Sequence, residues 1–236
     1  MALADLVADM AGIAGRFGPP STRGGRAVQF LALRSGDGVS TLARAFAQAV
    51  SGAAQKGVWL VELDVLADAQ ARAIAEQPDV FGPLGPAVRA SPDGSSFFKV
   101  TGAVGGARTA AGGYLMAHAV GPRRLWVTRF RPGALQPGQS IEMQDTDDYW
   151  RALREHADWI VVDAPALDRS EAGLVTARRM DANILVLNAA KADPQADLAL
   201  RDAVRRSGGA IAGAYLTHAP SQFLTIRPSV AGRRRR

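Results

Sequence analysis

The sequence contains no cysteine, only three tyrosines and no uninterrupted apolar run long enough to cross a membrane. Without cysteine the chain forms no disulfide, and thiolate catalysis and Cys-ligated metal sites are excluded. A membrane-spanning helix needs about 20 apolar residues, so none is expected, and the N-terminus lacks the basic, apolar and small-residue order of a signal peptide. These absences predict a cytoplasmic protein.

Excess positive charge is concentrated at one end of the chain. There are 28 basic and 22 acidic residues, which gives a net charge of +6, and the last four residues are arginines (Arg233, Arg234, Arg235 and Arg236). The remainder therefore carries only +2 (24 − 22), so a nucleic-acid-binding face is not expected. Two interpretations of the tail stay open: a solvated segment, or contact with an anionic membrane at about 1 kcal/mol per residue.

Short apolar segments alternate with helical ones along the chain. The apolar segments lie at residues 28–33, 58–63, 159–162, 182–187 and 210–216. Strands that alternate with helices predict an α/β fold, a doubly wound and mostly parallel sheet flanked by helices. Residues 67–144 give a weaker signal, with short strands expected at 97–100 and 125–130.

The chain length of 236 residues and the hydrophobic content of 47% fit one α/β core. Residues 1–25 are predicted to form an amphipathic helix and a linker, residues 26–226 the main domain, and residues 227–236 a basic tail. The helix can pack on its own domain or dock on a partner, since both need only an apolar stripe.

A glycine turn joins the first strand to an alanine-rich helix and has the form of a phosphate cradle. It contains Gly36, Asp37 and Gly38, and Ser40 and Thr41 open the helix. In such loops backbone N–H groups surround an anion at the helix N-terminus, a lysine reaches the phosphates and the next hydroxyl holds Mg²⁺. We therefore expect these residues to bind nucleotide.

Acidic residues end two of the predicted strands. Glu62 and Asp64 close the second apolar segment and Asp163 closes the third. Ligands of open α/β sheets gather at the carboxyl ends of parallel strands. These three carboxylates are therefore candidate catalytic groups.

Three motifs in this order resemble the MinD/ParA deviant Walker ATPases, and most closely the CpsD/CapB bacterial tyrosine kinases that partner polysaccharide co-polymerases. Residues 35–40 read SGDGVS against PGEGKS or PGEGKT, residues 60–66 read LVELDVL against LLIDADLR, and residues 161–166 read VVDAPA against IIIDTPP. The resemblance covers about residues 26 to 220.

The resemblance implies a P-loop fold that binds ATP or ADP with Mg²⁺. Ser40 and Asp163 would be the metal ligands, and Asp64 and Glu62 would act in catalysis. It also implies a membrane-bound polysaccharide co-polymerase as partner, a homo-oligomer, and a place at the inner face of the membrane.

Departures from the family pattern change the functional expectation. Val39 stands at the position of the loop lysine, Leu66 at that of an arginine, and the C-terminal tail has no tyrosine. A degenerate kinase-like protein that regulates or scaffolds exopolysaccharide synthesis and export is therefore expected. Two alternatives stay open: an active kinase or ATPase in which Arg34 or a partner supplies the missing charge, and a MinD/ParA-like positioning protein on membrane or DNA.

Overall fold

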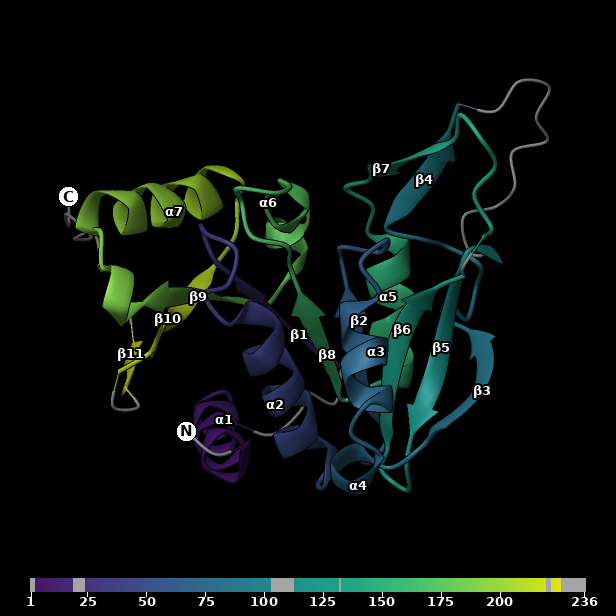
Figure 1. Ribbon diagram of the computed structural model, residues 1–236, viewed down its shortest axis with the longest axis horizontal. Helices are drawn as coiled ribbons and strands as arrows, with labels where there is room; N and C mark the ends of the chain where they lie inside the picture. Colours follow the sequence, from purple (N-terminus) through teal and green to yellow (C-terminus); the bar gives the residue numbers. More distant parts are fainter. Residues whose placement is uncertain (1–2, 19–23, 103–112, 132, 220–221, 226–236) are drawn as a thin grey trace, which may run out of the picture.

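The computed structural model describes residues 3–18, 24–102, 113–131, 133–219 and 222–225. A nine-stranded sheet in the order β11-β10-β9-β1-β8-β2-β6-β5-β3 forms its centre (Figure 1). The strands are β1 (Arg26–Leu31), β2 (Val58–Glu62), β3 (Leu84–Arg89), β5 (Leu115–Val120), β6 (Leu125–Phe130), β8 (Trp159–Asp163), β9 (Ala182–Asn188), β10 (Ile211–Thr217) and β11 (Gln222–Thr225).

The middle of the sheet is parallel. Strands β10, β9, β1, β8, β2 and β6 pair in parallel, whereas β11, β5 and β3 add antiparallel pairs at the two sides. Parallel strands covered on both faces are continuously apolar, and every residue of β2 and β8 is buried. The predicted fold class, a mostly parallel sheet flanked by helices, is confirmed.

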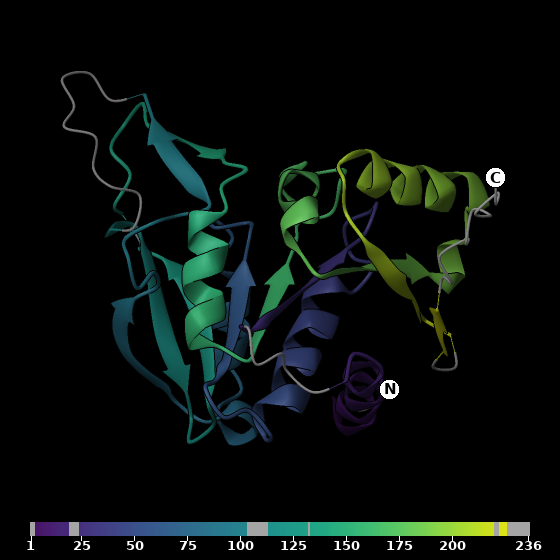
Figure 2. The same cartoon turned by 180° about the vertical axis from the view of Figure 1, so that it is seen from behind.

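Helices cover both faces of the sheet (Figures 1 and 2). One face carries α1 (Leu3–Arg16), α2 (Val39–Ser51), α3 (Ala69–Ala75) and α4 (Pro78–Phe81), and the other carries α5 (Asp148–His156), α6 (Ala172–Thr176) with the 3-10 turn η2 (Ala177–Arg179), and α7 (Pro194–Arg206). A further 3-10 turn, η3 (Ala189–Lys191), follows β9. A hydrophobic core lies on each face of the sheet, and successive residues of a strand point into opposite cores: Phe30 packs with α2, whereas Leu31 packs on the other face.

Helix α1 packs along α2 on its own domain. Leu6, Met10 and Ile13 form its buried stripe, and the Tyr215 hydroxyl of β10 donates a hydrogen bond to Asp9 at 3.0 Å. None of the helices in the described ranges is long and apolar enough to span a membrane.

The weakly patterned region 67–144 contains more structure than its sequence predicts. Strand β6 coincides with the predicted segment 125–130, and β4 (Phe98–Thr101) overlaps the segment predicted at 97–100. Strand β4 pairs with β7 (Ser140–Met143) in a separate two-stranded sheet rather than with the central one. Strands β3, β5 and β7 were not predicted, because β3 and β7 are largely exposed and β5 is only partly buried.

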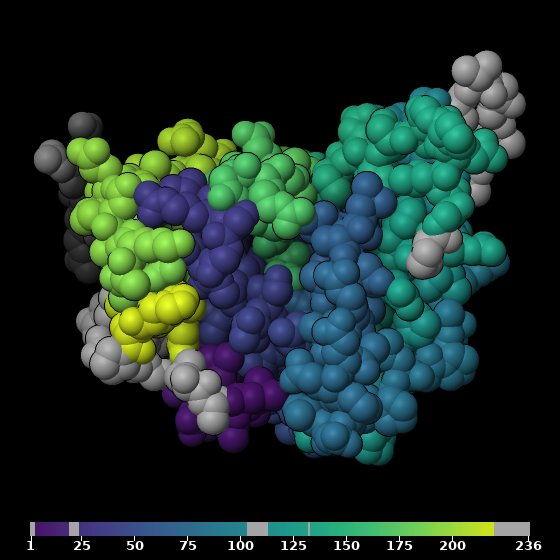
Figure 3. All heavy atoms as spheres, viewed as in Figure 1, coloured from purple at the N-terminus to yellow at the C-terminus, as the bar shows by residue number. Residues whose placement is uncertain are grey.

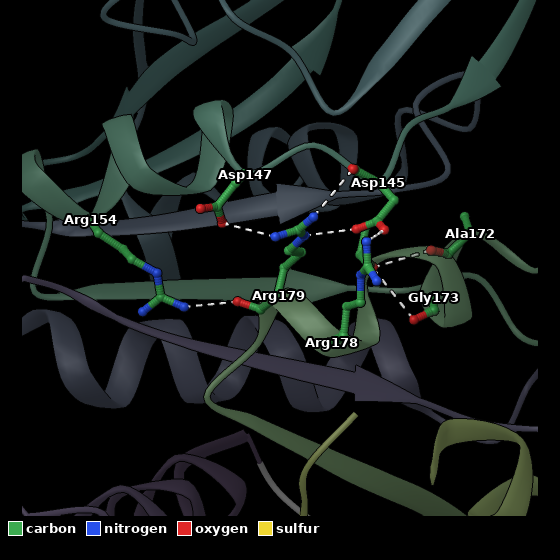
Figure 4. A network of polar contacts seen from close by, with 8 residues as sticks. Asp145, Asp147, Arg154, Ala172, Gly173, Arg178 and Arg179 are labelled. Carbon is green, nitrogen blue, oxygen red and sulfur yellow. Dashed lines mark hydrogen bonds and ion pairs between the residues drawn. The ribbon is translucent and has the colours of Figure 1, made fainter. Parts of the chain in front are cut away.

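An ion-pair cluster fixes α5 against η2 (Figure 4). Asp145, just before α5, pairs with both Arg178 and Arg179, and Arg179 also lies 3.3 Å from Asp147. Arg154 of α5 donates a hydrogen bond to the carbonyl oxygen of Arg179 at 2.9 Å. The cluster therefore holds η2 against α5. The connection between β8 and α6, which precedes η2, forms one wall of the site described below.

Candidate functional site

The loop between β1 and α2 has the backbone shape of a phosphate cradle. Gly36 and Gly38 adopt φ angles of 85° and 99°, which residues with a side chain rarely adopt. No side chain caps α2, so the N–H groups of its first turn stay open to a ligand. A Cβ atom on Gly38 would approach Thr217 Cγ2 to 3.3 Å, so this position is also confined by β10.

Residues from distant segments hold the loop in place. The Asp168 carboxylate accepts hydrogen bonds from the Ser35 backbone N–H at 2.8 Å and from its hydroxyl at 2.7 Å. These bonds lower the pKa of Asp168, the backbone bond most. The Thr217 hydroxyl donates to the carbonyl oxygen of Asp37 at 2.9 Å, and the Asn188 amide donates to the Asp37 side chain at 3.2 Å. The space-filling view shows the loop lying beside the β8–α6 connection (Figure 3).

The structure brings all the predicted site residues together around one cleft of about 300 Å³. Its lining includes Arg34, Gly36, Asp37, Gly38, Val39, Ser40, Thr41, Glu62, Asp64 and Asp163. Their individual roles stay predictions, but their placement at the carboxyl ends of β1, β2 and β8 is the one that the strand pattern indicates.

Val39 belongs to the hydrophobic core and is 7% exposed. Two arginines line the cleft, and both are ion-paired. Arg34 contacts Asp193 at 2.8 Å and donates to the carbonyl oxygen of Lys191, while Arg169 contacts Asp64 at 2.7 Å. Either guanidinium would have to leave its carboxylate before it could replace the missing lysine.

Glu62 and Asp163 are buried carboxylates. Burial raises the pKa of Glu62 from 4.5 to about 7, and the neighbouring Asp163 adds to this, while hydrogen bonds from the backbone N–H groups of Gln70 and Ala69 oppose it. Burial likewise raises the pKa of Asp163 from 3.8 to about 6, against hydrogen bonds from Gln70 and Ser40. Their ionised forms are thus costly in the folded protein.

Arg44 and Gln70 lie behind these acids. Arg44 of α2 donates a hydrogen bond to the Gln70 side-chain oxygen at 2.9 Å, and the Gln70 amide donates to Asp163 at 2.6 Å. Burial lowers the pKa of Arg44, and the charges of Asp163 and Glu62 oppose this. A cation is therefore already present beside the carboxylates.

The residues present fit a phosphate group but not the Mg²⁺ ion that the family resemblance implies. Mg²⁺ takes oxygen ligands at about 2.0–2.1 Å in octahedral geometry, usually one or two carboxylates together with waters and substrate phosphates, and each protein ligand needs a free lone pair. Asp163 accepts hydrogen bonds from both Gln70 and Ser40, Glu62 accepts two from α3, and Asp64 is paired with Arg169. Over the residues that the structure describes, no group of three or more His, Asp or Glu side chains could hold a metal ion.

Sequence reasoning missed Arg44, Gln70, Asp168 and Arg169. Arg44 is the only charged residue between Val39 and Ser51, and this isolation within an apolar helix was the available signal. Gln70 lies in the weakly patterned region, and nothing local distinguishes it. Asp168 and Arg169 directly follow the third motif, where they read as ordinary turn residues.

Comparisons with solved structures support the fold. The chain is similar to the chimerical protein CapA2B2 at 14% sequence identity and a TM-score of 0.53, over 89% of this chain and 84% of that one. The kinase domain of Escherichia coli tyrosine kinase ETK matches at 12% identity over 88% of this chain and 75% of that one, with a TM-score of 0.43. No protein-family model and no curated protein matches the chain. This chain therefore shares the fold of the CapA2B2 chimera.

Proposed function

We propose that this chain is a kinase-like P-loop protein that no longer transfers phosphate and serves as a regulatory or scaffold subunit of exopolysaccharide, or capsule, synthesis and export. The observation that carries the proposal is a cradle with an open first helical turn beside a core-buried Val39 at the lysine position. A lysine about 4 Å from a phosphate oxygen contributes about 4 kcal/mol at an effective dielectric of 20, before desolvation. Phosphoryl transfer depends mainly on such charges, so their loss affects turnover more than folding.

The tyrosines of this chain are poorly placed for autophosphorylation. The chain has three, Tyr114, Tyr149 and Tyr215, and their exposed fractions are 6%, 0% and 1%. A neighbouring subunit cannot phosphorylate a hydroxyl that the fold encloses. The folded chain therefore offers no tyrosine acceptor of its own.

A scaffold role accounts for a retained fold with degenerate chemistry. The motif order resembles that of kinases that partner polysaccharide co-polymerases, and the fold is that of the CapA2B2 chimera. The partner in this proposal is a membrane-bound co-polymerase at the cytoplasmic face, contacted by a homo-oligomer or by single chains. The tail arginines Arg233 to Arg236 would add attraction to anionic lipid.

The test combines calorimetry with a phosphorylation assay on the purified full chain. ATP and ADP are titrated with and without Mg²⁺ into the wild type and into Val39→Lys, and we expect the variant to bind more tightly because the cradle regains its cation. Incubation of the wild type with ATP, Mg²⁺ and a tyrosine-containing peptide as acceptor is expected to give no phosphotyrosine. Phosphotyrosine that forms in the wild type and disappears in Asp163→Ala would overturn the proposal.

A further inference from the structure

Gln70 connects four elements at the back of the cleft. Its side chain is fully buried, its backbone N–H donates to Glu62 at 3.1 Å, and its side-chain amide donates to the Ser40 carbonyl oxygen at 2.9 Å and to Asp163 at 2.6 Å. Its side-chain oxygen accepts from Arg44 at 2.9 Å. Both polar atoms of the side chain thus have partners, which fixes the orientation of its amide.

Arg44 supplies the positive charge of this cluster. It extends from α2 to the Gln70 side chain of α3, and Asp163 and Glu62 are the charges that favour its protonated form. An arginine stays charged even where burial opposes it. Two buried carboxylates therefore have a built-in counter-ion held by a buried amide.

The same arrangement leaves little room for a divalent cation. Asp163 accepts the Gln70 amide on Oδ2 at 2.6 Å and a further hydrogen bond from the Ser40 side chain, so two of the lone pairs that a metal or its water shell could use are engaged. Bringing Mg²⁺ to the cluster would also place two positive charges beside Arg44 in a poorly solvated site, which Coulomb repulsion disfavours.

We propose that Arg44 and Gln70 take the place of Mg²⁺ beside Glu62 and Asp163, so that this cleft accepts a phosphate group without a divalent cation. The inference rests on the proposed function only in taking the cleft as the phosphate site. It assigns to Arg44 and Gln70 a positioning role: they neutralise and orient the carboxylates and join α2 to α3.

Manganese binding by the full chain tests this directly, because Mn²⁺ uses the ligands of Mg²⁺ and is seen by electron paramagnetic resonance. Wild-type protein, alone or with saturating ADP, is expected to bind no Mn²⁺ at this site. The double variant Arg44→Met/Gln70→Met keeps the apolar stems but removes the cation and the amide. We expect it to bind one Mn²⁺, with a Kd at least about tenfold below the highest Mn²⁺ concentration at which the wild type shows no binding. A further Asp163→Asn substitution should abolish that binding.

The matched control is Arg72→Met/Gln77→Met, which removes the same two groups from exposed positions on or just after α3 and should leave Mn²⁺ binding as in the wild type. Stoichiometric Mn²⁺ binding by the wild type that Asp163→Asn removes would overturn the inference, even if the double variant fails to fold. If the double variant does not fold, Gln70→Leu alone removes the amide with a smaller change, and we expect this variant to gain Mn²⁺ affinity. Metal binding without phosphotyrosine would refute this inference and leave the proposed function standing.

Discussion

Glu62→Gln should flatten the dependence of stability on pH. A carboxyl group whose pKa is higher in the folded than in the unfolded chain holds its proton more tightly when folded, so the protein is most stable where that group is neutral and loses stability as pH rises. For Glu62 the pKa rises from 4.5 to about 7. At about 1.4 kcal/mol for each pKa unit, ionisation of Glu62 costs the folded state roughly 3 kcal/mol at pH values above 7.

Most of that cost should develop between about pH 5 and about pH 8, because the unfolded carboxyl is already largely ionised at the lower value. Glutamine cannot ionise, so the free energy of unfolding of the variant should fall by roughly 2–3 kcal/mol less than that of the wild type over this pH range. The lost acceptor for one α3 N–H group lowers the stability of the variant equally at all pH values and therefore does not change the slope.

The assay is urea unfolding followed by circular dichroism across that pH range, with Glu76→Gln as the control. Glu76 is the exposed residue that ends α3, and its variant should keep the wild-type slope. If Glu62→Gln retained the full wild-type decline, the reasoning that Glu62 is ionised at a cost in the folded state would be refuted.

Four further substitutions test the packing and one set of ion pairs. Gly25→Ala places a Cβ atom 2.3 Å from the backbone oxygen of Ala157 and should lower the free energy of unfolding in urea by at least about 1–3 kcal/mol. Its control, Gly12→Ala in α1, has nothing within 4 Å of the new Cβ atom and should raise the free energy of unfolding by up to about 1 kcal/mol. Tyr149→Phe should raise the melting temperature, because the hydroxyl is buried without a hydrogen-bond partner in the described residues, and a lower value would contradict this. Burial raises the pKa of Asp145 but its two arginine partners lower it further, so it lies below its ordinary value. Asp145→Ala should therefore cost about 1 kcal/mol at neutral pH and less as pH falls through that pKa, and an equal cost at acid pH would count against the ion pairs.

The sequence predicts the parallel centre of the sheet well because β1, β2, β8 and most of β9 are buried on both faces. Continuous apolar runs mark β1, β2, β8, β9 and β10, and the acids that end two of them lead directly to the cleft. The edge strand β3 lacks a continuous apolar run, since four of its six residues are exposed. Its pairing with β5 depends on contacts with another segment rather than on a local pattern.

Arg44 and Gln70 show why the site was predicted only in part. Gln70 is a polar residue on the seven-residue α3, which by itself indicates a solvent-facing position, whereas the isolation of Arg44 within an apolar helix is a weak local signal. Both are drawn inward because α2 and α3 pack on the same face of the sheet and the carboxylates of β2 and β8 end beneath them. The role of these residues comes from contacts with residues 26 and 93 positions away in the chain, and local periodicity does not encode such contacts.

Restoring the loop lysine alone should therefore improve binding without restoring catalysis. Val39→Lys adds a cation to the cradle, but it leaves the Arg44–Gln70–Asp163 hydrogen bonds in place, and in our proposal these take the place of the metal. With a tyrosine-containing peptide supplied as acceptor, we expect Val39→Lys to bind ADP more tightly and still form no phosphopeptide. Adding Arg44→Met and Gln70→Met should then allow slow, Mg²⁺-dependent transfer, because a metal is needed to neutralise the charge that develops on the transferred group. Phosphopeptide formed by Val39→Lys alone would show that the lysine was the one missing part, and that the Arg44–Gln70 pair does not close the metal position.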